Sequence, residues 1–330
     1  MATRRRKSDP RNELDELAAI RAEASTPAAR QKLSAALQKG SSLVAAKAAA
    51  IIREQSVDGF DADLQAAFDR FLQDPERTDP SCRAKLAILD ALDFAESPDP
   101  APFLAGIRYA QPEKAWGPPV DTATGVRARS AFALARLRHP EHALLMAELL
   151  LDPEPPVREA AADALAHRGD PAGGPLLLLK LRTGDAEPPV LLACLSALLS
   201  LAPPTGLSLA TEWLSGEDPA TRELGALALG ESRREEALER LLEVLERSVL
   251  PKERAVLLRA IALHRSERAL ATLLKAIATG SLADAKVVLE ALAPRAGESG
   301  LGRQVQDAAS QRPDASALQV ALGRFTAASP

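Results

Sequence analysis

The sequence has few aromatic side chains. Its 330 residues include one Tyr, two Trp and seven Phe, which is 3% of the chain. Aromatic residues favour β-strands, whereas Ala and Leu, which recur throughout this chain, are strong helix formers. The scarcity therefore argues against a β-rich fold. It predicts an all-α protein whose core is built from Leu, Ala, Val and Ile.

Cysteine and long hydrophobic runs are also scarce. The two cysteines, Cys82 and Cys194, stand far apart and outside any CxxC or CxxH context, so the sequence indicates no disulfide framework and a reducing compartment. The longest apolar stretch, VLLACLSALLSLA at 190–202, is shorter than the roughly 20 residues of a membrane span. The N-terminus is basic but lacks the apolar segment of a secretory signal. We therefore expect a cytoplasmic protein.

No motif for catalysis or metal binding stands out. P-loop, GxGxxG and GxSxG patterns are absent from the sequence. His139 and His142 are spaced so that two imidazoles face one metal ion, but no third ligand accompanies them. The sequence therefore predicts no catalytic residue, no metal site and no cofactor, and it favours a non-catalytic function.

A basic surface is missing as well. The formal net charge is −4, whereas nucleic-acid-binding domains usually carry clustered positive charge. A basic run, Arg4-Arg5-Arg6-Lys7, lies in a tail (residues 1–10) that we expect to be disordered. Four such charges support only weak, salt-sensitive binding. We therefore expect another protein as the partner, rather than a nucleic acid, and leave the oligomeric state open.

An internal repeat dominates the chain. Six segments align without gaps over nine residues: VRARSAFAL, VREAAADAL, VLLACLSAL, TRELGALAL, ERAVLLRAI and DAKVVLEAL. Their last residues recur every 31 to 33 positions, at Leu134, Leu165, Leu198, Leu229, Ile261 and Leu292. Apolar positions within each segment follow helical spacing, so each segment is predicted to be a helix with one buried stripe.

A second helical segment follows each of these first helices. REEALERLLEVL and SERALATLLKAI are the clearest copies, and turn sequences such as LDPEPP and SGEDP close the repeats. Proline cannot continue a helix, and Asp or Ser caps the next one. Two helices in about 32 residues cannot bury both apolar stripes by themselves, whereas stacked repeats can. The predicted fold is an α-α superhelix, or solenoid, of about seven to eight helical hairpins.

Blocks such as DPEPPVREAAADALAHRGDP and EDPATRELGALALG resemble HEAT repeats of the short bacterial type that also occurs in phycobilisome bilin lyases. The resemblance covers residues 126–310. It implies a scaffold or adaptor that binds a protein partner on a concave surface lined by the second helices. The sequence departs from the pattern at Leu191, where four of the other repeats carry Arg at the second position, in VR, VR, TR and ER.

The repeats suggest a division of the chain. We expect a basic tail at 1–10, an N-terminal helical cap at 11–40, two irregular HEAT-like repeats at 41–111, an inserted loop at 112–124, regular HEAT-like repeats at 125–312, and a C-terminal capping helix and tail at 313–330.

The insertion holds several of the rarest residues. The equivalent positions Leu92 and Leu134 are 42 residues apart instead of about 32, because Gln111–Thr124 is added between two repeats. It contains Trp116 and follows Tyr109, and aromatic residues dominate binding hot spots. Two interpretations stay open: a recognition element with Trp116 and Tyr109 as anchors, or a plug in which Trp116 folds back over the gap between imperfect repeats.

The second helices supply the other predicted partner-binding residues. Leucines that look surplus to the core suggest an exposed apolar patch: Leu144, Leu145, Leu176, Leu177 and Leu209. One turn further along, aligned positions form a predicted concave charge column: Glu148, Lys180, Glu212, Glu243 and Lys275. Neighbouring members could form ion pairs between repeats. Alternatively, the column is only a solvated face, and curvature or helix rotation buries the leucines.

Two other functions fit HEAT-like repeats. One is an accessory subunit similar to the bilin lyases, which act on a bilin and its acceptor protein. The other is an enzyme similar to the HEAT-like alkylpurine DNA glycosylases. The second would need a basic concave groove with aromatic residues and a carboxylate, which the mixed charge column and the negative net charge disfavour.

Overall fold

A computed structural model describes residues 10–327 of the chain. Within this range the chain forms twenty α-helices, four short 3-10 helices and one two-stranded sheet. This confirms the all-α prediction. The basic run from Arg4 to Lys7 lies outside the described residues.

By its internal contacts the chain divides into two units, Met1–Arg168 and Gly169–Pro330. The elements of the first unit are α1 (Pro10–Ala19), α2 (Pro27–Lys39), α3 (Ser42–Glu54), α4 (Asp61–Leu72), α5 (Pro75–Thr78), α6 (Arg83–Phe94), α7 (Ala101–Gly106), β1 (Pro112–Glu113), β2 (Val120–Asp121), α8 (Thr124–Arg136), α9 (His142–Leu149) and α10 (Pro155–Arg168). Two 3-10 turns, η1 (Arg21–Glu23) and η2 (Pro80–Cys82), interrupt them.

The second unit continues the pattern of alternating helices. Its elements are α11 (Gly173–Thr183), α12 (Pro188–Leu201), α13 (Pro203–Leu214), α14 (Pro219–Ser232), α15 (Glu235–Arg247), α16 (Pro251–His264), α17 (Glu267–Thr279), α18 (Leu282–Leu292), α19 (Leu301–Ser310) and α20 (Gln319–Ala327), with 3-10 turns at η3 (Ala293–Arg295) and η4 (Ala315–Leu318).

Helix starts follow the predicted turn chemistry. Several helices have Pro in their first turn, where no amide hydrogen is needed. Among the described helices, four have the residue directly before them as a cap, whose side-chain oxygen accepts a hydrogen bond from an amide of the first turn. These capping residues are Thr26, Asp218, Ser266 and Ser281.

The helical hairpins do not coincide with the repeats that the sequence suggests. Each hairpin joins the second helix of one sequence repeat to the first helix of the next. Each second helix packs most closely on the first helix of the following repeat, as α7 does on α8 and α13 on α14. The eight hairpins among the described residues are α2/α3, α4/α6, α7/α8, α9/α10, α11/α12, α13/α14, α15/α16 and α17/α18. Their number agrees with the seven to eight that the sequence predicts.

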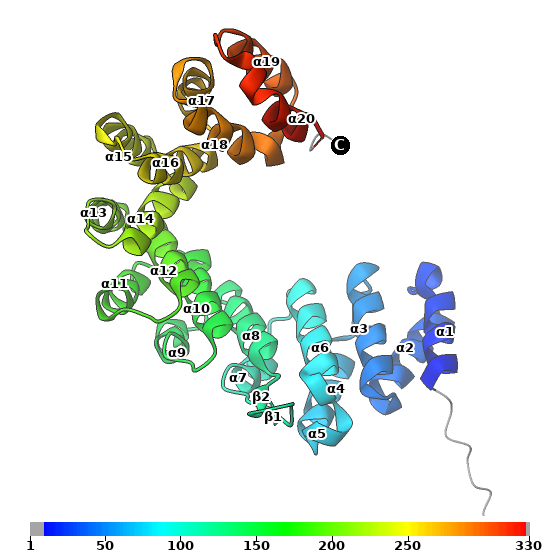
Figure 1. Ribbon diagram of the computed structural model, residues 1–330. Helices are drawn as coiled ribbons and strands as arrows, with labels where there is room; N and C mark the ends of the chain where they lie inside the picture. The colour runs from blue at the N-terminus through cyan, green and yellow to red at the C-terminus, as the bar shows by residue number, and fades with distance from the viewer. Residues whose placement is uncertain (1–9, 328–330) are drawn as a thin grey trace, which may run out of the picture. The chain divides into compact units, whose positions relative to one another are not determined.

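The two layers of helices differ in which side of the curve they occupy. In the second unit, α12, α14, α16 and α18 pack on one another in series and lie on the inner side of that unit's curve, with α11, α13, α15 and α17 outside (Figure 1). The second helices were expected to line the concave surface. For this unit that expectation is wrong, because each second helix is the outer member of its hairpin.

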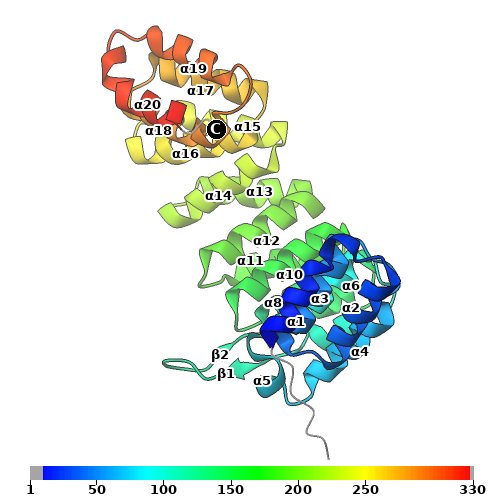
Figure 2. The ribbon, with the colours of Figure 1, turned by 90° about the vertical axis from the view of Figure 1, so that its right-hand side faces the viewer.

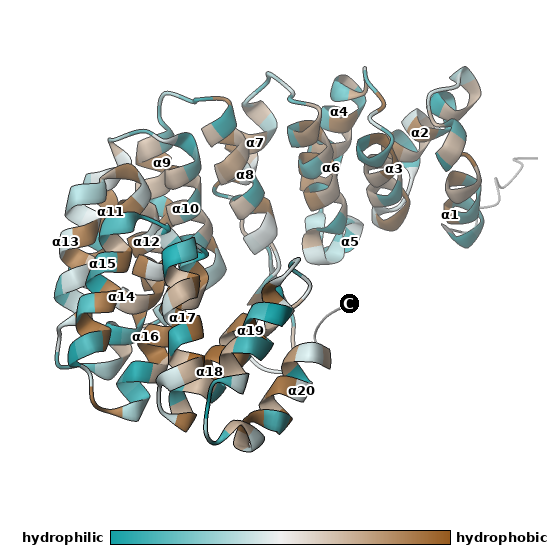
Figure 3. Cartoon of the chain, turned by 90° about the horizontal axis from the view of Figure 1, so that it is seen from above, coloured by the Kyte–Doolittle hydropathy of each residue, from teal (hydrophilic) through white to brown (hydrophobic). Residues whose placement is uncertain are grey.

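The core consists of aliphatic stripes, as composition suggests. Hydrophobic and hydrophilic residues alternate around individual helices (Figure 3). Leu and Ala make up most of the buried hydrophobic residues, and three phenylalanines, Phe68, Phe71 and Phe103, fill the irregular repeats of the first unit. Small residues let helices approach closely: a methyl group on Gly230 would lie 2.1 Å from the backbone oxygen of Ala260.

The Arg at the second position of the repeats has a structural role. Arg127, Arg158, Arg222 and Arg254 each donate a hydrogen bond from their guanidinium to a backbone carbonyl in the last turn of the preceding helix or within three residues after it. Carbonyls at helix ends lack intrahelical partners, so this contact satisfies them. Where Leu191 replaces the Arg, Lys180 instead forms an ion pair with Asp185 at 2.7 Å, and both side chains are largely buried.

Candidate functional site

The insertion between α7 and α8 is a β-hairpin. Pro112 pairs with Asp121 and Glu113 with Val120 in an antiparallel register. Residues 114–119 form the connecting tip. Figure 2 shows the hairpin extending away from the helices of the first unit. The insertion that interrupts the repeat is therefore a projecting hairpin. Its base and its tip carry different kinds of side chains.

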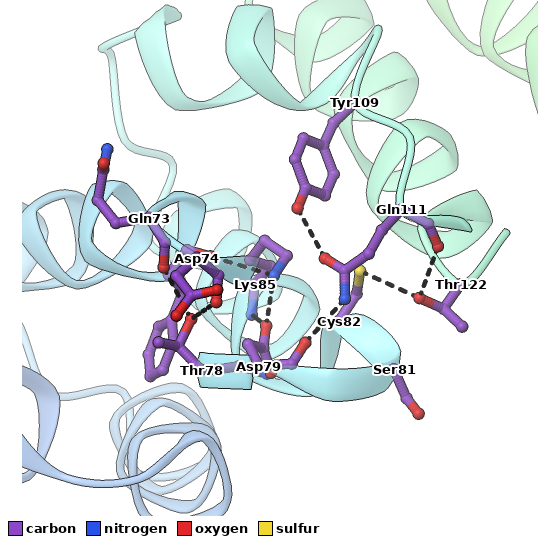
Figure 4. A network of polar contacts seen from close by, with 12 residues as sticks. Gln73, Asp74, Thr78, Asp79, Ser81, Cys82, Lys85, Tyr109, Gln111 and Thr122 are labelled. Carbon is purple, nitrogen blue, oxygen red and sulfur yellow. Dashed lines mark hydrogen bonds and ion pairs between the residues drawn. The ribbon is translucent and has the colours of Figure 1, made fainter. Parts of the chain in front are cut away.

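Gln111 forms the centre of the hairpin base (Figure 4). Its side-chain amide nitrogen donates to the backbone oxygen of Asp79 at 3.0 Å and to Oε1 of Glu113 at 2.6 Å. Its amide oxygen accepts from the hydroxyl of Tyr109 at 2.6 Å. Gln111 is 2% exposed, and buried polar groups need such partners. The hairpin is thereby attached to the turn before α6, one repeat earlier.

Glu113 extends the same attachment. Its Oε1 accepts hydrogen bonds from the backbone amide of Ser81 at 2.7 Å and from the hydroxyl of Thr122 at 3.0 Å, besides the one from Gln111. Desolvation favours the neutral acid, but these hydrogen bonds and the charge of Lys85 outweigh it and lower the pKa of the Glu113 carboxyl. The carboxylate therefore stays ionised and joins both strands to the Ser81 turn.

Asp121 fastens the second strand. One carboxylate oxygen accepts the backbone amides of Gln111 and Ala123, each at 2.9 Å, and the other pairs with Arg127 at 2.6 Å. Burial opposes the charge, yet these contacts lower the pKa of the Asp121 carboxyl. Arg127 also forms a two-point contact with Asp152 and is itself 4% exposed. The base is thus tied forward to the turn before α10.

A buried ion pair supports the turn below the hairpin. Nζ of Lys85 lies 3.0 Å from Oδ2 of Asp79, and both side chains are fully buried. Lys85 also donates to the backbone oxygen of Phe71, and the Asp79 carboxylate accepts the amides of Ala84 and Lys85. Lys85 is at the position that Arg127 holds one repeat later. The base of the hairpin is therefore built on the same inter-repeat contact as the other junctions.

Tyr109 belongs to the base rather than to an exposed surface. Its ring centre lies 5.3 Å from Nζ of Lys85, and its hydroxyl bonds Gln111. Burial, followed by the neighbouring negative groups, raises the pKa of the Tyr109 hydroxyl above its usual range. The residue is half-buried and helps to fix the path of the chain into the hairpin.

The tip carries the most exposed large hydrophobic side chain of the described residues. Trp116 is 108% exposed, so the interpretation of Trp116 as a plug that folds back is wrong. Gly117, which follows it, has φ +136°, a conformation that side-chain-bearing residues rarely adopt. Pro118 and Pro119 then restrict the return strand. The base satisfies the polar groups of the hairpin, while the tip presents an indole to solvent.

The predicted leucine patch is largely inside the protein. Leu145, Leu177 and Leu209 are 1%, 0% and 2% exposed, so an exposed patch of five leucines is wrong. Second helices such as α9 and α13 contact the first helices on both sides and bury a wider face than one stripe. Leu144 is exposed and Leu176 half-buried, so only these two retain accessible surface.

The predicted charge column forms ion pairs, but with other residues than expected. Glu148 pairs with Arg108, in the turn after α7, and Glu212 pairs with Arg182 of α11, each through two hydrogen bonds. The hydrogen bond from each Arg lowers the pKa of its Glu. Within the column itself, Lys180 is largely buried against Asp185, Glu243 pairs with Arg240 in its own helix, and Lys275 is exposed.

A charged ladder instead links the first helices α3, α6 and α8. Arg53 and Arg129 contact Asp90, and Arg129 and Arg136 contact Asp93. These five side chains alternate in sign, so each Arg lies beside a carboxylate. Sequence reasoning missed this ladder, because its members are 36 to 43 residues apart.

Residues 10–327 contain neither a metal-ligand cluster nor a membrane-spanning helix. No group of three or more His, Cys, Asp or Glu side chains is placed to hold a metal ion in this part of the chain. Among the same residues, every helix is too short or too polar to cross a lipid bilayer.

Comparisons with known proteins agree with the repeat architecture. The family model described as HEAT repeats matches residues 120–179. No curated protein matches the sequence significantly. Among solved structures, the crystal structure of an engineered protein aligns over 98% of this chain and 96% of its own, with 18% identity and a TM-score of 0.34, a value too low to support an argument. The family match over residues 120–179 and the stacked hairpins on either side of it support a HEAT-repeat architecture.

Proposed function

We propose that this HEAT-repeat protein is a non-catalytic scaffold that binds another protein, and that the Gln111–Thr124 hairpin is a contact element. HEAT repeats form scaffolds for protein interaction. The observation that carries the proposal is the complete exposure of Trp116 at the tip of a hairpin whose base is held by buried hydrogen bonds.

An exposed Trp on a fixed base is suited to binding. Trp is the residue type most enriched in interface hot spots. Binding costs less conformational entropy when the contact element is already ordered. Gln111, Glu113 and Asp121 order the base, and Pro118 and Pro119 restrict the tip. The hairpin therefore presents its indole with little flexibility to lose.

Two further apolar side chains extend the contact surface. Val120, in the second strand, is 54% exposed, and Leu151 is 77% exposed. Leu151 directly precedes Asp152, which Arg127 links to Asp121 at the hairpin base. We call Trp116, Val120 and Leu151 the hairpin surface. Large apolar side chains that gather on a soluble protein often mark a partner site.

Other functions of HEAT-like repeats lack such support. A DNA glycosylase needs unpaired basic groups on its groove, whereas Arg53, Arg129 and Arg136 on the first helices contact Asp90 and Asp93. The comparisons name neither a glycosylase nor a bilin lyase.

A pull-down with matched variants tests the proposal. Immobilised wild type, Trp116→Ala and Phe94→Ala are each exposed to lysate of the cells that make the protein. Phe94 is the control, because it is an aromatic residue of the same unit that is 58% exposed but lies outside the hairpin. We expect a partner that wild type and Phe94→Ala retain and Trp116→Ala loses, with circular dichroism unchanged. Equal retention by all three would remove the hairpin from the proposal.

A further inference from the structure

The second unit contains an apolar pocket of a size that suits an indole. Its volume is about 420 Å³, and it lies between the turns that precede α14 and α16. The apolar lining consists of Leu214, Pro219, Val244, Leu250, Val256 and Leu257. Leu214 and Leu257 are buried and form the floor, while Leu250 is 56% exposed at the opening. Pockets of roughly 300 Å³ or more hold small ligands and large side chains.

The rim of this pocket carries four charged groups. Arg222 donates to the backbone oxygens of Gly216 and Glu217 and lies 3.4 Å from Glu253, so these two charges face each other. Glu223 and Lys252 also line the pocket, and both are exposed. The carboxylate of Glu223 is therefore the rim group that suits an incoming cation.

We propose that the Trp116 hairpin of one copy of this chain docks in this pocket of a second copy. The indole of Trp116 would occupy the apolar floor over Leu214 and Leu257. Lys114, which is exposed two residues before Trp116, would approach Glu223. This inference rests on the proposed function, because it uses the same hairpin, and it names the partner as the chain itself.

The geometry of such a contact determines the kind of assembly. The hairpin is in one unit and the pocket in the other, so the two faces that meet are different. A contact of this kind joins copies head to tail and forms a ring or an open chain. A Trp side chain buries about 150–250 Å², far below the roughly 1,200–2,000 Å² of a stable interface. The association is therefore weak and depends on concentration.

Sedimentation velocity over a wide concentration range tests the proposal with full-length variants. Trp116→Ala removes the side chain that docks, and Leu250→Glu places a charge at the opening of the pocket. The controls are Phe94→Ala and Leu179→Glu, which change side chains that are also more than half exposed but lie outside both faces. We expect both docking variants to weaken self-association at least about tenfold and both controls to behave as wild type.

Mixing the two docking variants gives the sharpest result. Trp116→Ala keeps an intact pocket and Leu250→Glu keeps an intact hairpin, so the mixture has one complete contact. We expect each variant alone to be monomeric and the mixture to form a complex of one copy of each, without larger species. A mixture that stays monomeric would overturn the proposal, as would unchanged association of either variant.

The outcome separates this inference from the proposed function. If wild type stays monomeric at every concentration while Trp116→Ala loses a partner from lysate, the hairpin binds a different protein and self-docking is wrong. If self-association fails in both docking variants and no other protein depends on Trp116, the partner of the scaffold is a second copy.

Discussion

Two junctions of the same kind, before α8 and before α14, differ mainly by the hairpin. Before α14 the connection to the preceding helix consists only of residues 215–218. Arg222 donates to the carbonyls of Gly216 and Glu217, and Asp218 caps the helix. Before α8, Arg127 donates to the carbonyl of Tyr109 and Asp121 accepts the amide of Ala123. Both junctions therefore use an Arg-to-carbonyl contact and an Asp before the helix. Before α8 that Asp is Asp121, so the hairpin's second strand supplies part of the junction itself.

The largest effect should come from the junction below the hairpin. Lys85→Met would leave the carboxylate of Asp79 buried without its cation, and such a break costs about 3–5 kcal/mol of unfolding free energy. Urea unfolding followed by circular dichroism measures the loss. Asp79 and Lys85 are both fully buried, so a change below about 1 kcal/mol would show that this pair does not hold the junction.

A direct comparison of the two junctions comes next. Arg127→Ala removes a side chain that is 4% exposed and pairs with two carboxylates, so we expect a loss of about 2–4 kcal/mol. Arg222→Ala removes one that is 28% exposed, and we expect about 1 kcal/mol. The two variants are unfolded in urea under identical conditions. Equal losses would mean that the hairpin junction has no extra buried ionic contact.

Lowering the pH should weaken the contribution of the hairpin base to the unfolding free energy. The pKa values of Glu113 and Asp121 are lowered in the folded chain. Their contribution to stability is therefore present above the unfolded pKa of about 4 and is lost as the pH falls through the folded values. Glu113→Gln should flatten the fall in unfolding free energy between about pH 5 and pH 2. An unchanged slope in the variant would contradict the assigned role of Glu113.

The smallest effect on stability should come from the tip. Trp116 is fully exposed, so Trp116→Ala should change the unfolding free energy by no more than about 0.5 kcal/mol. Thermal and urea unfolding measure this. A large destabilisation would show that the indole packs within the chain.

The sequence predicted the repeats well, because helical periodicity and turn residues are local signals. The sequence did not show which neighbour each second helix packs on most closely. A helix with one apolar stripe can pack on the helix before it or on the helix after it, and both arrangements give the same hydrophobic periodicity. No local pattern shows which layer of helices lies inside the curve, so the inner side expected for the second helices of the second unit was wrong. The buried Leu145 and Leu209 follow from the same cause, because helices that contact two neighbours bury more than one stripe.

The hairpin base could be predicted only in part. The spacing of 42 residues between Leu92 and Leu134 located the insertion. Its attachment depends on contacts between segments about 30 residues apart, such as Gln111 with Asp79, which no local pattern reveals. One signal was available: Asp precedes the Lys or Arg by six positions at both Asp79 and Asp121. The same spacing recurs at Asp152 and Arg158, so it indicates an inter-repeat junction but does not show where the hairpin is attached.

Photo-crosslinking at the tip tests most directly whether the hairpin is the contact element. p-Benzoyl-phenylalanine is placed at Trp116 in one sample and at Phe94 in the other, both exposed aromatic positions of the first unit. After irradiation in cells, mass spectrometry identifies each adduct. We predict a specific protein adduct, either another protein or a second copy of the chain, from position 116 and none from position 94. Adducts from position 94 alone, or none from either position, would contradict the account.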